Sequence, residues 1–186
     1  MPPVPKRSLA VRRVTGLVNH GPTVLASCRH AGRSNLITLA WAMPVSIDPP
    51  MIAIAVAPER FSHDLIADSG EFVLNVPGSD LLRAVWYCGT VSGRNGDKFD
   101  GAGLTEAPAA VVGAPLVAEC FGHVECRVVD TPTTGDHTLF VGEVVAVSVE
   151  SSAYDGHLKL TGPYNTLHHL GGPRFVTSAG TKLSAA

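Results

Sequence analysis

The sequence predicts a mainly β protein, an antiparallel barrel with short helices attached. Six or more segments alternate apolar and polar residues or are rich in β-branched residues, as strands are. Only two short stretches have helical character, and strands and helices do not alternate regularly, which argues against a doubly wound parallel sheet. The length suits one domain, so we expect a single unit over 1–186 with loose tails at 1–10 and 177–186.

The composition is that of an ordinary globular protein, with 45% hydrophobic residues, 16% charged residues and a net charge of -2. This near-neutral balance gives no electrostatic reason to expect nucleic acid or an anionic membrane as a partner. No apolar run approaches the roughly 20 residues that span a bilayer. The first residues also lack the apolar core of a signal peptide, so we expect a cytoplasmic protein.

Four cysteines occur at spacings that fit no zinc pattern: Cys28, Cys88, Cys120 and Cys126. A chain of this length does not need disulfides to stabilise its core. We expect reduced and mostly buried thiols.

The stretch from Asn35 to Pro50 is apolar and begins with strand character. Its two faces differ in size, one bulky (Ile37, Leu39 and Trp41) and one small (Thr38, Ala40 and Ala42). A small face lets a flat ligand lie against the backbone, while Pro49 and Pro50 force an extended exit toward a second strand, Met51 to Val56. The stretch fits the wall of a ligand slot or two ordinary core strands, and alone it favours the second interpretation.

The flanking segments predict strands and two helices. A short strand is expected over Val11 to Leu17, and a second over Thr23 to Cys28 leads through a glycine turn at His30 to Arg33 into a hairpin. Ser62 can cap a helix that has Asp64 in its first turn and ends near Ser69, before Gly70.

Glu71 to Val76 alternates as a strand does. A second helix should start at Ser79 or Asp80 and direct four apolar residues inward: Leu81, Leu82, Val85 and Trp86.

A glycine-rich loop is predicted over Cys88 to Leu104, and loops of that length are often functional. Residues 105–115 look irregular. Two long strands follow, His123 to Val128 and Thr138 to Val149, with a turn at Thr133 to His137 between them. From Tyr154 onward no clean periodicity remains.

Arg60, Ser62 and the start of the helix that follows them form a candidate anion site. Free backbone N–H groups, a hydroxyl and a guanidinium would converge there on a phosphate. The alternative is that Ser62 only caps its helix, which the local motif favours.

Ser92, Arg94 and Lys98 lie in the glycine-rich loop and give it a basic, flexible character. Such a loop can bend around phosphates or remain in solvent, and the sequence supports both equally. The chain contains no GxGxxG fingerprint and no P-loop, which argues against a Rossmann or Walker nucleotide site.

His137 follows Gly135 and Asp136 at the predicted turn, where its ring could donate a hydrogen bond with Asp136 orienting it. A plain hairpin turn is the alternative, and the local sequence favours it. His168 and His169 have neither the spacing nor the companion carboxylates of a metal site, so we expect no metal.

Four segments in order resemble one known family, although each is weak alone. They are TLAWAMPVSIDPPMIAIAV, RFSHDLIADSGEFVLNVP, CGTVSGRNGDKF and GDHTLFVGEVVAV. Together they resemble the flavin reductase-like FMN-binding split barrels, most nearly the flavoredoxin type, over roughly residues 11–176. The resemblance implies a six-stranded antiparallel split barrel that binds FMN, usually as a homodimer with the site near the subunit interface.

The resemblance also implies roles for site residues. Thr38, Leu39, Ala40 and Trp41 would lie along the isoalloxazine edge, closed by Ser46. Arg60 and Ser62 would hold the phosphate, with Ser92, Arg94 and Lys98 approaching the phosphate or the ribityl chain. His137 would face the nicotinamide side, and Tyr164 with the segment Gly171 to Phe175 would cover the site.

The implied function is an FMN oxidoreductase that takes hydride from NADH or NADPH and passes electrons on, with an acceptor protein as a possible partner. The alternatives are a flavoredoxin-like electron carrier with tightly bound FMN, or a non-catalytic FMN-binding protein. One departure bears on this choice. Many two-component reductases have small Ser or Thr residues after the site threonine, where this chain has Leu39, Ala40 and Trp41, and this favours a tightly held FMN.

Overall fold

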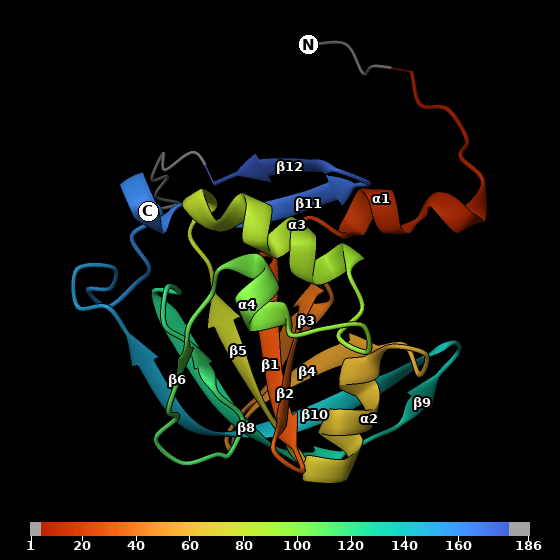
Figure 1. The fold of residues 1–186 in the computed structure, drawn as a ribbon. Coiled ribbons are helices and arrows are strands. Elements are labelled where there is room, and N and C mark those ends of the chain that lie inside the picture. Colours follow the sequence, from red (N-terminus) through yellow and green to blue (C-terminus); the bar gives the residue numbers. More distant parts are fainter. Residues whose placement is uncertain (1–4, 179–186) are drawn as a thin grey trace.

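The protein is built on one curled antiparallel sheet with short helices around it, as the computed structural model of residues 5–178 shows (Figure 1). The strands follow the order β2-β1-β5-β8-β10-β4-β3, and β9 pairs with β10 beside this path. Their bounds are β1 Val24–His30, β2 Arg33–Leu39, β3 Ala42–Ile47, β4 Pro50–Val56, β5 Glu71–Val76, β8 Gly122–Asp130, β9 Thr133–Thr134 and β10 His137–Val149. The predicted antiparallel β class is confirmed, although this sheet has eight strands in place of six.

The ends of the sheet meet at a seam. Strands β2 and β3 stand at opposite ends of the strand order, yet only Ala40 and Trp41 separate them in the chain. The sheet must therefore curl round until its two ends adjoin, which makes it a barrel with one split side. The single strand expected through Trp41 is in fact two strands, because the chain turns from one end of the sheet to the other at these two residues.

The hairpin of β1 and β2 has the predicted tight turn. His30 pairs with Arg33, and the two residues between them, Ala31 and Gly32, both have positive φ angles of 47° and 75°. Two central residues with positive φ define the turn type whose twist matches that of paired strands. This hairpin sets the register of β2, whose far end forms part of the cavity described below.

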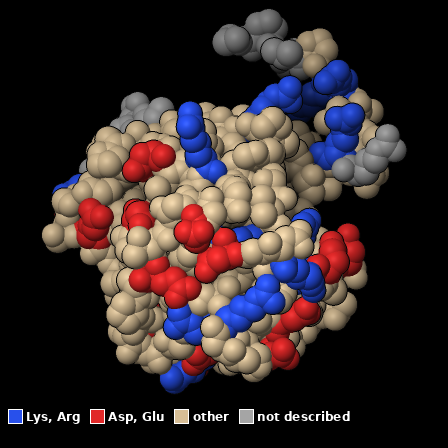
Figure 2. Space-filling view, in the orientation of Figure 1, with Lys and Arg blue, Asp and Glu red and all other residues tan. Residues whose placement is uncertain are grey.

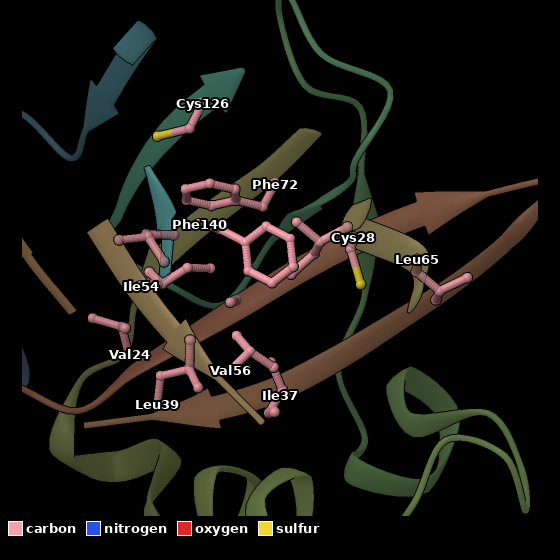
Figure 3. Close-up of a cluster of buried hydrophobic side chains, with 13 residues drawn as sticks. Val24, Cys28, Ile37, Leu39, Ile54, Val56, Leu65, Phe72, Cys126 and Phe140 are labelled. Carbon is pink, nitrogen blue, oxygen red and sulfur yellow. The ribbon is translucent and has the colours of Figure 1, made fainter. Parts of the chain in front are cut away.

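The barrel interior is filled by alternate residues of its strands (Figure 3). Phe72 and Phe140 lie at its centre, and both are fully buried. The neighbouring strands contribute smaller side chains to the same cluster: Val24, Ala26, Cys28, Ile37, Leu39, Ile54, Val56, Leu74 and Cys126. On the opposite face of β1, Leu25 packs in a second cluster beneath the helices, so β1 is buried on both faces from Val24 to Cys28.

The segment before β1 is helical, and the strand expected over Val11 to Leu17 is wrong. A 3-10 turn η1 (Val11–Arg13) and one helical turn α1 (Thr15–Val18) occupy it. Val11 is 89% exposed. A β-branched segment becomes a strand only where a sheet edge pairs with it, and this segment has no strand partner among residues 5–178.

Helix α2 (Phe61–Ser69) ends as predicted at Gly70, whose φ of 67° stops the helix. Its start differs from the prediction. Arg60 is the N-cap residue, and Ser62 lies inside the first turn, where its hydroxyl accepts a hydrogen bond from the Asn35 amide instead of capping the helix.

Helix α3 (Leu82–Thr90) follows a 3-10 turn η2 (Ser79–Leu81) and buries Ala84, Val85 and Cys88. The inward placement expected for Leu82 and Trp86 is wrong, since both are about two-fifths exposed. The sequence could not reveal which side of the helix the chain packs against.

The predicted loop from Cys88 to Leu104 is shorter than expected. Helix α3 runs into it, and a further helix α4 (Lys98–Ala102) begins where the Asp97 carboxylate accepts the N–H groups of Phe99 and Asp100. Residues 91–97 remain as the loop. An Asp followed by a glycine at the helix end is a recognisable helix signature that the glycine content concealed.

Two small sheets complete the fold. One joins β6 (Glu106–Ala107) to β7 (Leu116–Val117), in a region expected to be irregular. After a 3-10 turn η3 (Gly162–Tyr164), the hairpin of β11 (Leu167–Gly171) and β12 (Arg174–Thr177) lies against α3 at one end of the barrel (Figure 1). Of the expected loose tails, 1–4 and 179–186 lie outside the described residues.

The four cysteines are all free and buried, as expected. None of the helices in residues 5–178 has the length and apolar character needed to cross a membrane. On the face shown in Figure 2, acidic and basic side chains are interspersed over the barrel, and basic ones gather on the N-terminal arm.

Candidate functional site

A cavity of about 530 Å³ opens between the end of β2, the start of α2, the loop 91–97 and the C-terminal hairpin. That volume lies within the usual range of small-molecule and cofactor sites. Most of the site residues predicted from the sequence line it: Thr38, Leu39, Ala40, Trp41, Arg60, Ser62, Ser92, Lys98 and His137. Residues nearly a hundred positions apart are brought together here by the curl of the sheet.

Ser46 and Arg94 do not line this cavity. Ser46 lies on β3 beside a bulge in its pairing with β4, beyond the seam. The Arg94 guanidinium donates to the Glu59 carbonyl (2.9 Å) and pairs with the Asp64 carboxylate (2.8 Å). Through these contacts, the Arg94 side chain links the loop 91–97 to the start of α2.

One end of the cavity suits an anion. Arg60 stands at the N-terminus of α2, and no side chain caps the first turn of that helix. The backbone N–H groups of such a turn, together with the helix dipole, favour a negatively charged ligand. The adjoining Ser62 is 1% exposed, and its Oγ accepts from Asn35 Nδ2 at 2.8 Å.

Asn35 is a cavity residue that the sequence reasoning missed. It is 2% exposed, and its Oδ1 has no hydrogen-bond partner within residues 5–178. A Cβ added at Gly93 would lie 2.0 Å from this oxygen, so the loop backbone packs directly on the amide. Because buried polar atoms are nearly always paired, this unpaired acceptor indicates that a ligand or a water donates to it at the cavity wall.

The anion end is braced by stacked guanidinium groups. Arg33 lies over the Phe61 ring at 4.4 Å, and Arg94 lies at 5.3 Å from the same ring centroid. Arg33 also donates to the Gly93 carbonyl at 2.7 Å. These cation–π and hydrogen-bond contacts fix the loop 91–97 over the first turn of α2.

Lys98 is a buried cation, only 5% exposed, that bridges two elements of the site. Its Nζ donates to the Leu36 carbonyl of β2 (2.8 Å) and to the Cys88 carbonyl of α3 (2.7 Å). Burial lowers the pKa of Lys98, and burial also raises the pKa of the nearby Cys88 thiol to about 11. Two of the three N–H groups of Lys98 thus serve to position the cavity walls.

The other end of the cavity is more open. The rings of Trp41 and His137 lie 4.9 Å apart with a tilt of 42°, and Trp41 is 42% exposed. His137 Nδ1 lies 2.7 Å from the Asp136 carboxylate, and this hydrogen bond lowers the pKa of Asp136. With Nδ1–H donating to Asp136, the outer Nε2 accepts when the ring is neutral and donates only when the ring is protonated.

Further residues complete the walls. Thr38 Oγ1 donates to the Val85 carbonyl, and Gly89 of α3 approaches that side chain so closely that a Cβ there would lie 3.3 Å from it. Asn19 from the N-terminal arm and His169 from β11 also line the cavity. Tyr164, expected in the covering segment, instead bonds to Ser152 and Glu150 away from it.

Within residues 5–178, no group of three or more His, Cys, Asp or Glu side chains is placed to hold a metal ion. The polar groups that line the cavity are amides, hydroxyls, imidazoles, the cationic side chains of Arg60 and Lys98, and one carboxylate, that of Glu59. The amide, hydroxyl and cationic donors among them suit an organic anion with a flat ring system.

Comparisons with known proteins agree with this geometry. The family model described as "Flavin reductase like domain" matches residues 15–168. An uncharacterized protein of Pyrococcus abyssi is 38% identical over 83% of this chain and 88% of its own length. The NADH:riboflavin 5'-phosphate oxidoreductase of Streptomyces pristinaespiralis is 29% identical over 67% of this chain and 68% of its own. Among solved structures, flavoredoxin from Methanosarcina acetivorans superposes with a TM-score of 0.84 at 26% identity, covering 98% of this chain and 96% of its own.

Proposed function

The chain belongs to the flavin reductase-like domain family, and on that basis we propose that it binds FMN in the cavity and takes hydride onto it from NADH or NADPH. One observation gives the main support for this proposal. A single cavity has an uncapped helix N-terminus with Arg60 and the unpaired Asn35 Oδ1 at one end, and aromatic rings at the other. FMN has a phosphate, a hydroxylated chain and a flat ring system in that order.

The residues present fit such a molecule. Arg60 and the first turn of α2 would hold the phosphate, with Ser92 beside them in the cavity wall. Asn35 Oδ1 would accept from a ribityl hydroxyl, which removes the one orphaned acceptor at that place. The ring system would lie along the end of β2, where Ala40 leaves the backbone accessible and Trp41 limits the opening.

When bound, the flavin supplies the hydride and electron chemistry, and the protein supplies position and electrostatics. Lys98 holds β2 and α3 at a fixed separation, because its ammonium group donates to a carbonyl of each. The part of the cavity between these elements, where the flavin ring would lie, therefore keeps a constant width. Trp41 and His137 stand at the open end, where a nicotinamide would enter. The Asp136 carboxylate holds the His137 ring in one orientation for that contact.

A flavoredoxin-like electron carrier is the second candidate. Flavoredoxins from Desulfovibrio vulgaris (Miyazaki F) and Methanosarcina acetivorans are each 26% identical to this chain over nearly all its length. The bulk of Trp41 at the opening supports a flavin that stays bound between reactions, as a carrier of electrons to a protein partner needs. A non-catalytic FMN-binding protein is the third outcome.

The visible spectrum of the purified protein tests these proposals in one series. A yellow protein whose flavin bleaches when NADH or NADPH is added anaerobically supports the reductase. A yellow protein that ignores both nucleotides but is bleached by dithionite supports the carrier or the non-catalytic binder. A colourless protein that takes up no FMN contradicts all three.

We also propose a homodimer. Apolar side chains stand exposed on β3, among them Met43 (56%), Val45 (44%) and Ile47 (96%), next to the seam and hence close to the cavity. A closed symmetric pair would bury this face. Ile47→Asp should convert a dimer to a monomer in sedimentation. Val129→Asp is the control, because Val129 is also exposed but lies on β8, which β10 and β4 separate from β3. A wild-type protein that sediments at 19.4 kDa contradicts the dimer.

The cytoplasm is the proposed location, because four free buried thiols are typical of proteins from reducing compartments. Fractionation of cells with an antibody against the protein tests this. Recovery in a secreted or membrane fraction would contradict it.

A further inference from the structure

A second, smaller pocket of about 140 Å³ lies between α3 and the β11–β12 hairpin. It adjoins the main cavity at the end of β2, where the flavin ring system would lie; this part of the cavity is called the ring end. It shares five residues with the main cavity: Thr38, Ala40, Gly89, Thr90 and His169. Four others belong to it alone: Thr23, Val85, Trp86 and Phe175. The two spaces are therefore neighbours with a common wall.

The walls of the small pocket are aromatic. Trp86 and Phe175 meet edge to face with ring centroids 6.4 Å apart and an interplanar angle of 87°. Phe175 also lies 5.0 Å from the ring of His169. A set of rings held in this way offers both faces and edges to another flat ring. Trp86 is two-fifths exposed, so a large apolar ring that would ordinarily be buried stands at the edge of the pocket.

One polar group of this pocket has no partner. Thr23 is 1% exposed, and its Oγ1 makes no hydrogen bond within the part of the chain that the structure describes. Its backbone N–H is occupied by the Leu167 carbonyl at 2.7 Å. The other threonine hydroxyls of the pocket are already used, since Thr38 donates to the Val85 carbonyl and Thr90 to the Trp86 carbonyl. A buried hydroxyl without a partner is rare and indicates that a ligand or water completes it.

The size of the pocket limits what it can hold. An engineered protein cavity of about 150 Å³ accommodates one benzene ring. The small pocket has nearly that volume, which admits a single ring and excludes a three-ring flavin.

We propose that the small pocket is a binding site for a single-ring planar compound that carries one carbonyl oxygen. The ring lies among Trp86, Phe175 and His169, and the Thr23 hydroxyl donates to the carbonyl. Because the pocket opens beside the ring end of the main cavity, the compound lies next to the proposed flavin seat. The position relative to FMN rests on the proposed function, whereas the pocket and its unpaired hydroxyl do not.

A matched pair of probes tests the proposal. Acetophenone is a planar ring with one carbonyl, and ethylbenzene has a similar size without it. Each is titrated into FMN-loaded protein, with binding followed by amide NMR shifts at Thr23, Thr90 and Phe175. We expect acetophenone to bind at these residues and to bind more tightly than ethylbenzene.

Thr23→Val keeps the shape of the side chain and removes the hydroxyl. It should weaken acetophenone binding about fivefold and leave ethylbenzene binding unchanged, which is the size expected for one neutral hydrogen bond. Thr131→Val, at an exposed site on the far loop, is the control and should change neither. The melting temperature of Thr23→Val should not fall, because the hydroxyl that it removes has no partner to lose. Trp86→Ala should weaken both probes.

Three results would overturn the proposal. If the two probes bind equally and Thr23→Val has no effect, the Thr23 hydroxyl does not contact the carbonyl. If acetophenone causes no NMR shifts in a protein that binds FMN, the pocket is not a binding site for it. If acetophenone binds only when FMN is absent, the flavin itself occupies the pocket. A protein that fails to bind FMN contradicts the proposed function instead, and acetophenone titration of that protein still decides the pocket.

Discussion

The two ends of the main cavity are built differently. At the anion end, Asn35 and Ser62 are almost fully buried and bonded to each other, and the Phe61 ring is covered by Arg33 and Arg94. At the ring end, Trp41 is 42% exposed, and the carboxylate that orients His137 belongs to Asp136, whose side chain is 96% exposed. Many contacts hold the side chains of the anion end in place, and few contacts hold those of the ring end.

This difference matches a division of labour. A ligand group that must stay bound gains most from a site already arranged before binding, because little ordering remains to be done. A group that must meet a second reactant needs an accessible surface. The following changes are ordered by the size of the effect that this division predicts.

Arg60→Ala should have the largest effect, because it removes the exposed guanidinium that stands beside the uncapped first turn of α2 at the anion end. We expect FMN binding to weaken by about 1.5–3 kcal/mol, or roughly 10- to 150-fold, the usual range for a charge-assisted hydrogen bond. Fluorescence titration of apoprotein with FMN measures it. Arg83→Ala, on the exposed face of α3, makes the same charge change and should bind FMN as the parent does. An unchanged dissociation constant in Arg60→Ala would place the phosphate elsewhere.

Gly93→Ala tests whether the anion end is as closely packed as it looks. A Cβ at Gly93 would lie 2.0 Å from Asn35 Oδ1, so either the loop or the amide must move. We expect about 1–3 kcal/mol of lost stability, as for other overpacked sites, together with weaker FMN binding. Gly96→Ala is the matched control in the same loop, since a Cβ there meets nothing within 4 Å. Equal melting temperatures for the two variants would contradict the packing argument.

His137→Ala acts at the open end and should therefore spare FMN affinity. If the protein is a reductase, the loss of this ring should slow flavin reduction by NADH or NADPH about tenfold, because hydride transfer depends steeply on geometry. Anaerobic stopped-flow absorbance measures the rate, and reduction by dithionite is the control that should not change. Equal hydride rates in variant and parent would remove His137 from the mechanism.

Ser46→Ala should have the smallest effect. Ser46 lies on β3 outside the cavity, although the resemblance to known flavoproteins places it at the flavin edge. We expect FMN affinity to change less than about twofold, as for substitutions away from a site. A larger loss in the same titration would mean that Ser46 reaches the flavin, for example across the proposed dimer interface.

Much of the fold was predictable because its signals are local. Gly32 predicts the turn between β1 and β2, and Gly70 predicts the end of α2. The alternation of apolar and polar residues predicts the strands. The predictions that failed depend on distant neighbours. Trp86 is apolar and suits a buried helix face, but its surroundings come from β12, nearly ninety residues later.

The site shows the same limit. Arg60, Ser62 and His137 stand in motifs that can be read along the chain, and all three line the cavity. Asn35 and Thr23 do not stand out in the sequence, because each is an ordinary polar residue in or beside an apolar strand. Their importance comes from a hydrogen bond that is missing, and a missing bond can be recognised only when every neighbour has been placed.

Strand β3 ends the sheet, and its outer edge pairs with no other strand in residues 5–178. An apolar edge strand of this kind invites identical strands to add to it and aggregate. Pro44 offers no N–H for such pairing, and the bulge between Pro44 and Ser46 breaks the regular spacing of the strand. The exposed side chains of β3 can therefore meet another protein face to face, while its backbone resists growth of the sheet into a fibril.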